Sequence, residues 1–331
     1  ETMSKERANS LYPSALTRRS KVGIVGAGFV GTALAYACQI KGAAREIALF
    51  DINKAKVEAE ALDLAHGIQF TPAASISGSD DVEVLRDSDV IVITAGPQQK
   101  PGQSRLDMVQ AMVNIMNSIL PKVLNVAPDA IYILVSNPVD IATYMALKMS
   151  GLPSHQVFGS GTVLDTSRMR YLISQETGVA VQNIHAYIAG EHGDSEVPLW
   201  SSAEIGNVPL SRWGATVGGG IFDDKLQKRI AKDVVESAYR IIDGKGVTNF
   251  AIGLAVTNII SAVMRDEDRV LTVSSLLDNW NGISGVCMAA PTLVGRSGVG
   301  RVLDPPITLN ERDALTRSAE KLSEVAKSVG L

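Results

Sequence analysis

Cysteine and long apolar segments are both scarce in this sequence of 331 residues. Only two cysteines occur, Cys38 and Cys287, each inside an apolar run, which argues against a disulfide framework or a zinc cluster and favours a reducing compartment, the cytoplasm. The longest apolar runs, such as 90–95 and 130–135, have the length of a strand and are too short to cross a bilayer. We therefore expect a soluble protein with buried, inert thiols.

An excess of one charge sign is also lacking, because the formal net charge is only -4. This balance gives no general attraction to nucleic acid or to anionic lipid, so we expect no nucleic acid and no membrane as partner and favour small-molecule chemistry. Residues 1–20 mix basic and acidic side chains without the apolar core of a signal peptide, and we interpret them as an N-terminal arm.

From Lys21 onward, short runs of apolar and β-branched residues alternate with helical stretches. This alternation is typical of an α/β fold with a doubly wound parallel sheet of the Rossmann type. Ligands bind such sheets beyond the carboxyl ends of the strands, so we expect chemistry in the loops after residues 94 and 135. The expected strands are Lys21–Val25, Glu46–Phe50, 90–94, 131–135 and 157–160.

Capping signals mark the ends of several helices. Ser104 and Asp107 form a capping box that starts a helix running to about Val126, and Pro138 opens another. A second capping box at Thr308 starts a C-terminal helix. After residue 161 the pattern becomes mixed α+β, with helices expected at 163–175, 223–242 and Phe250–Met264 and strands at 185–189, 270–274 and 285–289. We predict an arm at 1–20, a Rossmann domain at 21–161 and an α+β substrate domain at 162–331.

A glycine fingerprint directly follows the first expected strand and opens a helix. Backbone amides and the helix dipole at such a turn can receive a pyrophosphate. Asp51 lies about twenty residues further on, at the end of the second expected strand, where its carboxylate would accept hydrogen bonds from a ribose diol and repel a 2'-phosphate. The alternative is a close-packed glycine turn with an acidic cap. The pattern favours NAD (NADH) over NADP, held by Gly26, Gly28, Phe29, Val30, Gly31 and Asp51.

Two later segments carry groups suited to redox chemistry on a 2-oxo acid. Asp165 and Arg168 are three positions apart, which on a helix places both side chains on one face. Asp165 can orient His192 so that the other ring nitrogen delivers a proton to a carbonyl oxygen. Arg168 offers a planar fork of donors that matches a substrate carboxylate. Either segment alone is better explained as a surface pair or a loop histidine, but together they indicate a catalytic site.

With the glycine fingerprint, the segments SNPVD (136–140), GTVLD (161–165) and GEHGD (190–194) make the chain resemble the lactate and malate dehydrogenase family, from about Lys21 to the C-terminus. The resemblance implies an NAD-dependent L-2-hydroxy acid dehydrogenase. It further implies that Arg105 polarises the substrate carbonyl when a mobile loop closes, and that Asn137 hydrogen-bonds the same oxygen. It places Thr248 in the substrate pocket and Ile252 against the nicotinamide, with Ala95, Gly96 and Ser136 at the cofactor.

Gln99 occupies the position that discriminates between substrates in this family. Malate enzymes carry an arginine there to pair a second carboxylate, whereas glutamine supplies no charge. Enclosing oxaloacetate would then cost on the order of several kcal/mol. We expect reversible reduction of pyruvate to L-lactate, a reaction of glycolysis and fermentation. A loop register shifted by one residue would put Lys100 at this position, which leaves a malate or broader 2-hydroxy acid dehydrogenase as the alternative.

Regulation and assembly are also implied by the resemblance. Arg170 and His185 match the cationic pair with which bacterial members bind fructose 1,6-bisphosphate at a subunit interface, in an allosteric homotetramer. The alternative is a solvated arginine beside a strand-end histidine. Two other classes stay open, a catalytically silent NAD-binding sensor and a metal-dependent NAD glycosidase. The ligands of the latter are not apparent, so we predict no metal.

Overall fold

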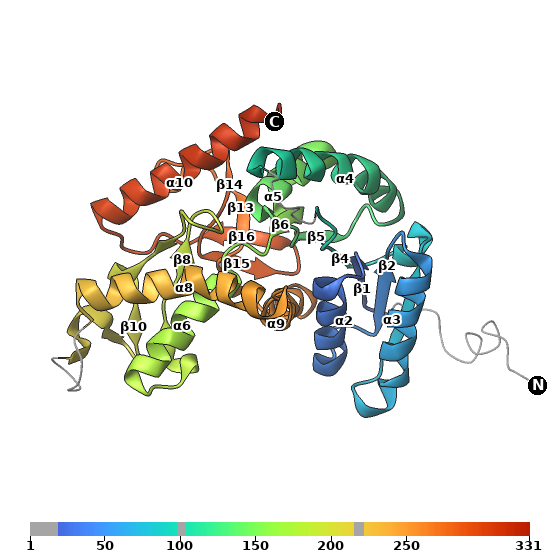
Figure 1. Cartoon of the computed structure of the whole chain (residues 1–331), viewed down its shortest axis with the longest axis horizontal. Coiled ribbons are helices and arrows are strands. Elements are labelled where there is room, and N and C mark those ends of the chain that lie inside the picture. The colour runs from blue at the N-terminus through green and yellow to red at the C-terminus, as the bar shows by residue number, and fades with distance from the viewer. Residues whose placement is uncertain (1–18, 98–103, 215–221) are drawn as a thin grey trace, which may run out of the picture.

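An eight-stranded sheet forms the centre of the molecule, with strand order β14-β13-β6-β5-β4-β1-β2-β3 (Figure 1). The structure is a computed structural model that describes residues 19–97, 104–214 and 222–331. Six strands of this sheet run parallel, and their bounds are β1 (Lys21–Val25), β2 (Glu46–Phe50), β3 (Ser75–Ser79), β4 (Val90–Ile93), β5 (Ile131–Leu134) and β6 (Val157–Gly159). The predicted doubly wound parallel sheet is confirmed.

β3 is a strand that the sequence pattern did not indicate. Its residues are half-exposed or exposed, because it lies at the edge of the sheet and carries few apolar side chains. Gly78 permits the pairing, since a Cβ atom there would come within 2.5 Å of the carbonyl oxygen of Val57 in the neighbouring helix. Close packing of a helix on this strand, and not apolar alternation, therefore fixes it in the sheet.

Helices cover both faces of the sheet, and alternate residues of β4 show how. Ile91 and Ile93 pack in one buried cluster with α4 (Arg105–Val126) and α5 (Val139–Ser150). Val90 and Val92 pack in a second cluster on the opposite face. The helices of that second face are α2 (Phe29–Lys41), α3 (Lys54–His66) and α9 (Phe250–Met264), the last of which lies beside α2 (Figure 1). Burial of both faces explains the continuous apolar runs of the central strands.

Both predicted capping boxes form. The Ser104 hydroxyl accepts from the Asp107 amide while the Asp107 carboxylate accepts from the Ser104 amide, and Thr308 and Glu311 do the same at the start of α10 (Leu309–Ser328). Helix α10 packs beside α5 at the top of the view in Figure 1. Pro138 is the residue just before α5, so the helix begins where the proline predicts.

The second half departs from the prediction at two strands. Residues 185–189 do not form one strand but two, which are β7 (Ile184–His185) and β8 (Ile188–Ala189) in different small sheets. Residues 270–274 likewise divide into β12 (Arg269–Leu271) and β13 (Ser274–Leu276). At the second division the carbonyl of Thr272 accepts from the backbone amide of Thr162, which begins the turn into α6, and not from a strand partner.

Strands β13 and β14 (Cys287–Ala289) extend the main sheet, with β13 antiparallel to β6. The remaining strands are β9 (Val197–Pro198), β10 (Glu204–Ile205), β11 (Val208–Pro209), β15 (Thr292–Gly295) and β16 (Gly298–Val302), and the remaining α-helices among the described residues are α6 (Val163–Thr177) and α8 (Asp224–Lys245). Short 3-10 helices are η2 (Ile68–Phe70), η3 (Val82–Leu85), η4 (Ser154–Gln156), η5 (Val181–Asn183), η6 (Trp200–Ser202) and η7 (Leu210–Arg212). Within the described ranges, no helix has the length and apolar character needed to traverse a bilayer.

Candidate active site

A cavity of about 260 Å³ lies where the carboxyl ends of β5 and β6 meet α6, α8 and α9. Predicted site residues from distant parts of the sequence line it together, namely Val30, Asn137, Asp165, Arg168, His192, Thr248 and Ile252. A larger cleft of about 1070 Å³ lies at the amino ends of β1 and β5 and contains none of the predicted site residues. Convergent chemical groups, and not volume, identify the smaller cavity as the candidate site.

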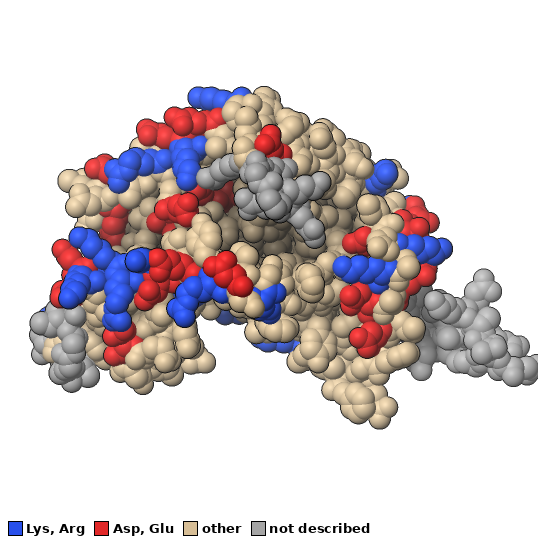
Figure 2. All heavy atoms as spheres, viewed as in Figure 1, with Lys and Arg blue, Asp and Glu red and all other residues tan. Residues whose placement is uncertain are grey.

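Surface charge gives no competing candidate on the face shown in Figure 2. Basic and acidic side chains alternate over α8 and α10, and no broad field of one sign appears there. This mixture agrees with the balanced net charge of the sequence. We therefore consider local groups inside the cavity as the source of any specificity for a charged ligand.

The first turn of α6 positions Asp165 and Arg168. Asp165 is buried in this turn, where the helix dipole favours a negative charge. Arg168, one turn further along, donates from Nη1 to Asp165 Oδ1 at 3.3 Å and is 12% exposed. This is the same-face pairing expected from their spacing. A guanidinium has five N–H donors, so this bond leaves others for a ligand in the cavity.

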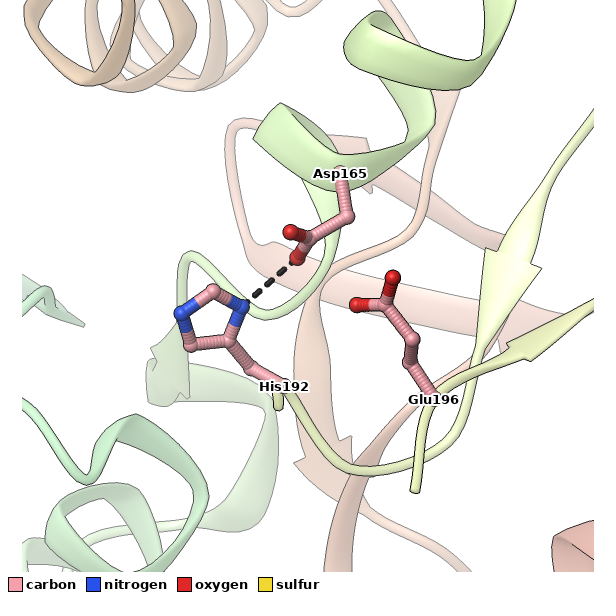
Figure 3. A group of neighbouring side chains, drawn as sticks. All are labelled: Asp165, His192 and Glu196. Atoms are coloured by element: carbon pink, nitrogen blue, oxygen red, sulfur yellow. Dashed lines mark hydrogen bonds and ion pairs between the residues drawn. The ribbon is translucent and has the colours of Figure 1, made fainter. Parts of the chain in front are cut away.

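Two carboxylates hold His192, one at its ring and one at its backbone amide. Its ring Nδ1 donates to Asp165 Oδ2 at 2.6 Å (Figure 3). Its backbone amide donates to Asp140 Oδ2 at 2.9 Å, and the other oxygen of Asp140 accepts from the Ser274 hydroxyl at 2.7 Å. These bonds fix the position of the loop after β8 and the orientation of the His192 ring. Because Nδ1 is engaged with Asp165, the other ring nitrogen, Nε2, is left for a ligand.

These charges control the proton affinity of His192. Burial by itself lowers its pKa, but the charge and the hydrogen bond of Asp165, together with the charges of Asp140 and Glu196, raise the pKa to about 9. The imidazolium form is therefore populated throughout the neutral range. A group that holds a proton at neutral pH beside an open cavity is suited to act as a general acid.

Sequence reasoning missed Asp140 and Glu196. Asp140 ends the SNPVD segment, so the motif was visible, but its contact with the His192 amide depends on a fold that spans 52 positions. Burial raises the pKa of Asp140 to about 6. Glu196 points its carboxyl group toward the same cluster (Figure 3), and only its place four residues after His192 could have drawn attention to it.

One ligand atom from each of Asp165, His192 and Glu196 lies within 4.8 Å of the others. Such a cluster can in principle attract a metal ion. However, the ring Nδ1 of His192 is already engaged with Asp165 at 2.6 Å, and we interpret the cluster as a site for protons.

The glycine loop after β1 has the geometry of a phosphate cradle. Gly26 has a φ of +106°, and a Cβ atom on Gly31 would lie 1.9 Å from the Gly26 carbonyl oxygen, so neither position tolerates a side chain. A Cβ atom on Gly28 would meet nothing within 4 Å, and no side chain caps the start of α2 there. The first turn of α2 thus has room and backbone donors for a pyrophosphate.

Asp51 lies beside this loop at the end of β2. Its two oxygens accept from the amides of Ala27 at 2.8 Å and Asn53 at 2.9 Å, which orients the carboxylate. Gly96 and Ser136 approach each other closely after β4 and β5. Val30 and Ile252 lie in the wall of the catalytic cavity, so cofactor and substrate residues share one space. The residues present fit a dinucleotide that extends from the glycine loop to His192.

Two predicted site groups cannot be placed. Gln99 lies outside the described residues, and so does the side chain of Arg105, although the backbone of Arg105 begins α4. Ser104, the first described residue after this gap, forms the capping box that begins α4.

The two predicted effector residues lie on neighbouring elements. Arg170 of α6 donates from Nε to the carbonyl of Ala186 at 3.0 Å and stacks over the Tyr187 ring at 5.2 Å. Burial lowers the pKa of Arg170. His185 is exposed on β7, next in sequence to Ala186.

Comparison with known proteins covers both halves of the chain. The model of the lactate/malate dehydrogenase NAD-binding domain matches residues 20–159, and that of the lactate/malate dehydrogenase alpha/beta C-terminal domain matches residues 162–330. An L-lactate dehydrogenase from Bifidobacterium animalis subsp. lactis is 56% identical over 311 residues, covering 94% of this chain and 97% of that protein. One from Clostridium perfringens is 45% identical over 305 residues, covering 92% and 96%. The crystal structure of a minor L-lactate dehydrogenase from Enterococcus mundtii has a TM-score of 0.90 at 38% identity, covering 94% of this chain and 99% of that one.

Proposed function

The chain belongs to the lactate/malate dehydrogenase family, and we propose that it is an L-lactate dehydrogenase that reduces pyruvate to L-lactate with NADH and also runs the reaction in reverse. The observation that carries this proposal is the 2.6 Å bond between His192 and Asp165 beside the Arg168 guanidinium. A proton donor next to a carboxylate anchor is what a 2-oxo acid requires.

In the proposed reaction His192 supplies the proton. The protonated ring faces the keto oxygen of pyruvate and donates from Nε2 as negative charge develops there, while Asp165 stabilises the imidazolium. Oxidation of lactate needs the opposite state, a neutral ring that accepts the hydroxyl proton. Because the pKa of His192 is about 9, neutral pH favours the reductive direction.

Other residues of the site bind and orient the substrate. Arg168 pairs with the pyruvate carboxylate through donors that Asp165 does not use. We assign to Asn137 and Arg105 the hydrogen bonds to the keto oxygen. Thr248 lines the cavity, and we assign to Thr248 and Gln99 the contacts with the methyl group. An uncharged glutamine admits a methyl group, whereas a second carboxylate would stay unpaired.

The cofactor, when bound, would donate a hydride as NADH during reduction of pyruvate and accept one in its oxidised form during oxidation of lactate. The glycine loop and the first turn of α2, at Gly26, Gly28, Phe29, Val30 and Gly31, would hold its pyrophosphate, and the Asp51 carboxylate its ribose diol. We assign Ala95, Gly96, Ser136 and Ile252 to the nicotinamide half.

A panel of 2-oxo acids with NADH tests the proposal by the loss of NADH absorbance. We expect catalytic efficiency on pyruvate to exceed that on oxaloacetate by at least about a hundredfold, since an unpaired carboxylate costs several kcal/mol. A preference for oxaloacetate would overturn the lactate assignment in favour of malate, and failure to oxidise NADH with any 2-oxo acid would leave only a binding protein.

We extend the proposal to regulation, assembly and location. Arg170 and His185, paired across a two-fold axis of a homotetramer, would bind fructose 1,6-bisphosphate as an allosteric activator. The free, buried thiols of Cys38 and Cys287 support a reducing compartment, the cytoplasm, where the reaction would serve glycolysis and fermentation. The division at residues 161 and 162 is the proposed border between the cofactor and substrate domains.

The effector site is tested by pyruvate saturation curves at neutral pH and low phosphate, with and without fructose 1,6-bisphosphate. We expect the sugar bisphosphate to lower the pyruvate KM, and Arg170→Gln to abolish that response. Identical curves with and without the effector would dismiss this part of the proposal and leave the reaction itself untouched.

A further inference from the structure

The carboxyl group of Glu196 has no role in the reaction described above. Its Oε1 atom is buried and has no hydrogen-bond partner in the described part of the chain. It nevertheless points toward the His192 and Asp165 pair (Figure 3). An ionised carboxylate that is buried without a partner is costly, so this position favours the neutral acid.

The charged and titratable groups around Glu196 and its neighbour Asp194 come from three elements. Helix α6 contributes Asp165 and Arg168, and the loop after β8 contributes His192 and Asp194. Helix α8 contributes Tyr239, whose hydroxyl donates to Asp194 at 3.3 Å. Asp194 is exposed, so water screens its charge more than it screens the others.

The protonation of Glu196 sets the charge balance of the buried cluster. Arg168 and His192 carry positive charge in this cluster, and Asp165 and Asp140 carry negative charge. Ionisation of Glu196 adds one further negative charge beside Arg168 and His192, the two groups that face the substrate. The attraction of the cavity for an anionic substrate therefore falls when Glu196 is ionised.

We propose that Glu196 is a second proton-bearing group of this site, neutral while pyruvate binds, and that its ionisation weakens pyruvate binding in addition to the loss of the His192 proton. The inference rests on the proposed function, because it concerns the binding of a carboxylate substrate. Glu196 acts here through the charge of the cavity and not by proton transfer to the substrate.

The surroundings of Glu196 favour its neutral form. Burial first, and then the charge of Asp165, raise the pKa of Glu196 to about 8. A rise in pH from neutral to alkaline values therefore ionises Glu196 as well as His192. At pH 9 a group with a pKa of about 8 is neutral in roughly one molecule in eleven, so the pyruvate KM rises by up to about tenfold from this ionisation alone.

The test compares pyruvate KM at saturating NADH from pH 6 to pH 10 in the wild type and in Glu196→Gln, which is permanently neutral. Both should have a similar KM at pH 6.5, and the variant should have a KM lower by at least about threefold at pH 9. The logarithm of KM should approach a slope of two against pH in the wild type and of one in the variant. Glu204→Gln on β10, the same change outside the cavity, should follow the wild type.

The outcomes separate the two proposals. Superimposable profiles of wild type and Glu196→Gln would overturn the role of Glu196 while the enzyme still reduces pyruvate. A wild type that reduces no pyruvate at any pH would instead refute the proposed function. An increase in KM for Glu196→Gln at pH 6.5 would show that the anion, and not the neutral acid, supports binding.

Infrared difference spectra of the unmodified protein give a second measurement that does not depend on folding of the variant. Between pH 7 and pH 9 we expect the band of one protonated carboxyl group to disappear. Asp140 does not interfere, because its pKa of about 6 means that most of its proton is lost below pH 7. Absence of such a band at pH 7 would overturn the proposal.

Discussion

An Asp165→Asn substitution keeps the shape of the side chain but removes the charge that His192 faces. In the wild type, His192 Nδ1 donates to Asp165 Oδ2 at 2.6 Å, and the Asp165 side chain is only 4% exposed. Its field is therefore poorly screened. The pKa of His192 is about 9 compared with an ordinary 6.5, a difference that favours the imidazolium by roughly 3 kcal/mol.

Burial of the ring lowers the pKa of His192, and in the wild type the charge of Asp165 outweighs this effect. Without that charge the pKa of His192 should fall to about 6.5 or below. At pH 7.5 no more than about one molecule in ten would then carry the proton that pyruvate needs. The loss of protonated ring alone should lower kcat/KM for pyruvate by about tenfold at pH 7.5, and the lost orientation of the ring should lower it further, up to the factor of about 10²–10⁴ that a positioned general acid contributes. The pH at which pyruvate binding fails should also move down by at least about two units.

The assay is NADH oxidation at saturating cofactor from pH 5.5 to pH 10, with thermal unfolding to verify folding. Asp278→Asn, an exposed aspartate outside the cavity, serves as the matched control and should behave as the wild type. The electrostatic account of His192 would be wrong if kcat/KM of Asp165→Asn at pH 7.5 stayed within about threefold of the wild-type value. It would also be wrong if the activity of the variant declined only near pH 9, as in the wild type.

The same pKa governs stability. Because the folded pKa of His192 lies above its unfolded value of 6.5, the stabilisation is complete below pH 6.5 and is lost as pH rises to about 9. The wild type should therefore lose thermal stability over this window relative to Asp165→Asn. Parallel Tm curves for the two proteins between pH 6.5 and pH 9 would contradict the linkage.

Three further substitutions test the cofactor and specificity assignments. Gly31→Ala places a Cβ atom 1.9 Å from the Gly26 carbonyl and should weaken NADH binding by at least about tenfold in a fluorescence titration; unchanged affinity would refute the cradle. Asp51→Ser should lower the ratio of catalytic efficiencies with NAD over NADP by roughly tenfold to a hundredfold, since a charged acceptor for the ribose diol is lost, and a constant ratio would count against that contact. Gln99→Arg should shift preference toward oxaloacetate by at least about a hundredfold, and a variant that still favours pyruvate would disprove the charge argument.

Local patterns in the sequence predicted much of the cofactor half. The central strands are continuous apolar runs because both faces of the sheet are buried, and such runs are visible without a structure. The two capping boxes depend on residues three positions apart, so they also form as predicted. Edge strand β3 escaped prediction because its half-exposed residues carry no apolar signal.

The second half was harder to predict because its strands are short and depend on partners far away. The sequence predicted one strand at residues 185–189, yet residues 186 and 187 leave strand geometry and β7 and β8 join different sheets. The pairing of β13 with β6 joins residues more than a hundred positions apart and extends the main sheet across the predicted domain border. Nothing local specifies such a partner.

The sequence by itself determined which chemical groups this protein possesses and where short-range spacing would place them: the glycine turn, the Asp165 and Arg168 face of α6, and the uncharged Gln99. Only the tertiary structure decided the surroundings of those groups. It placed Asp140 under the His192 amide and buried the Oε1 atom of Glu196 without a hydrogen-bond partner among the described residues, and through them it set the proton affinities of the site. The physical reason is that desolvation and Coulomb interactions depend on distances through space, which a linear order of residues does not contain.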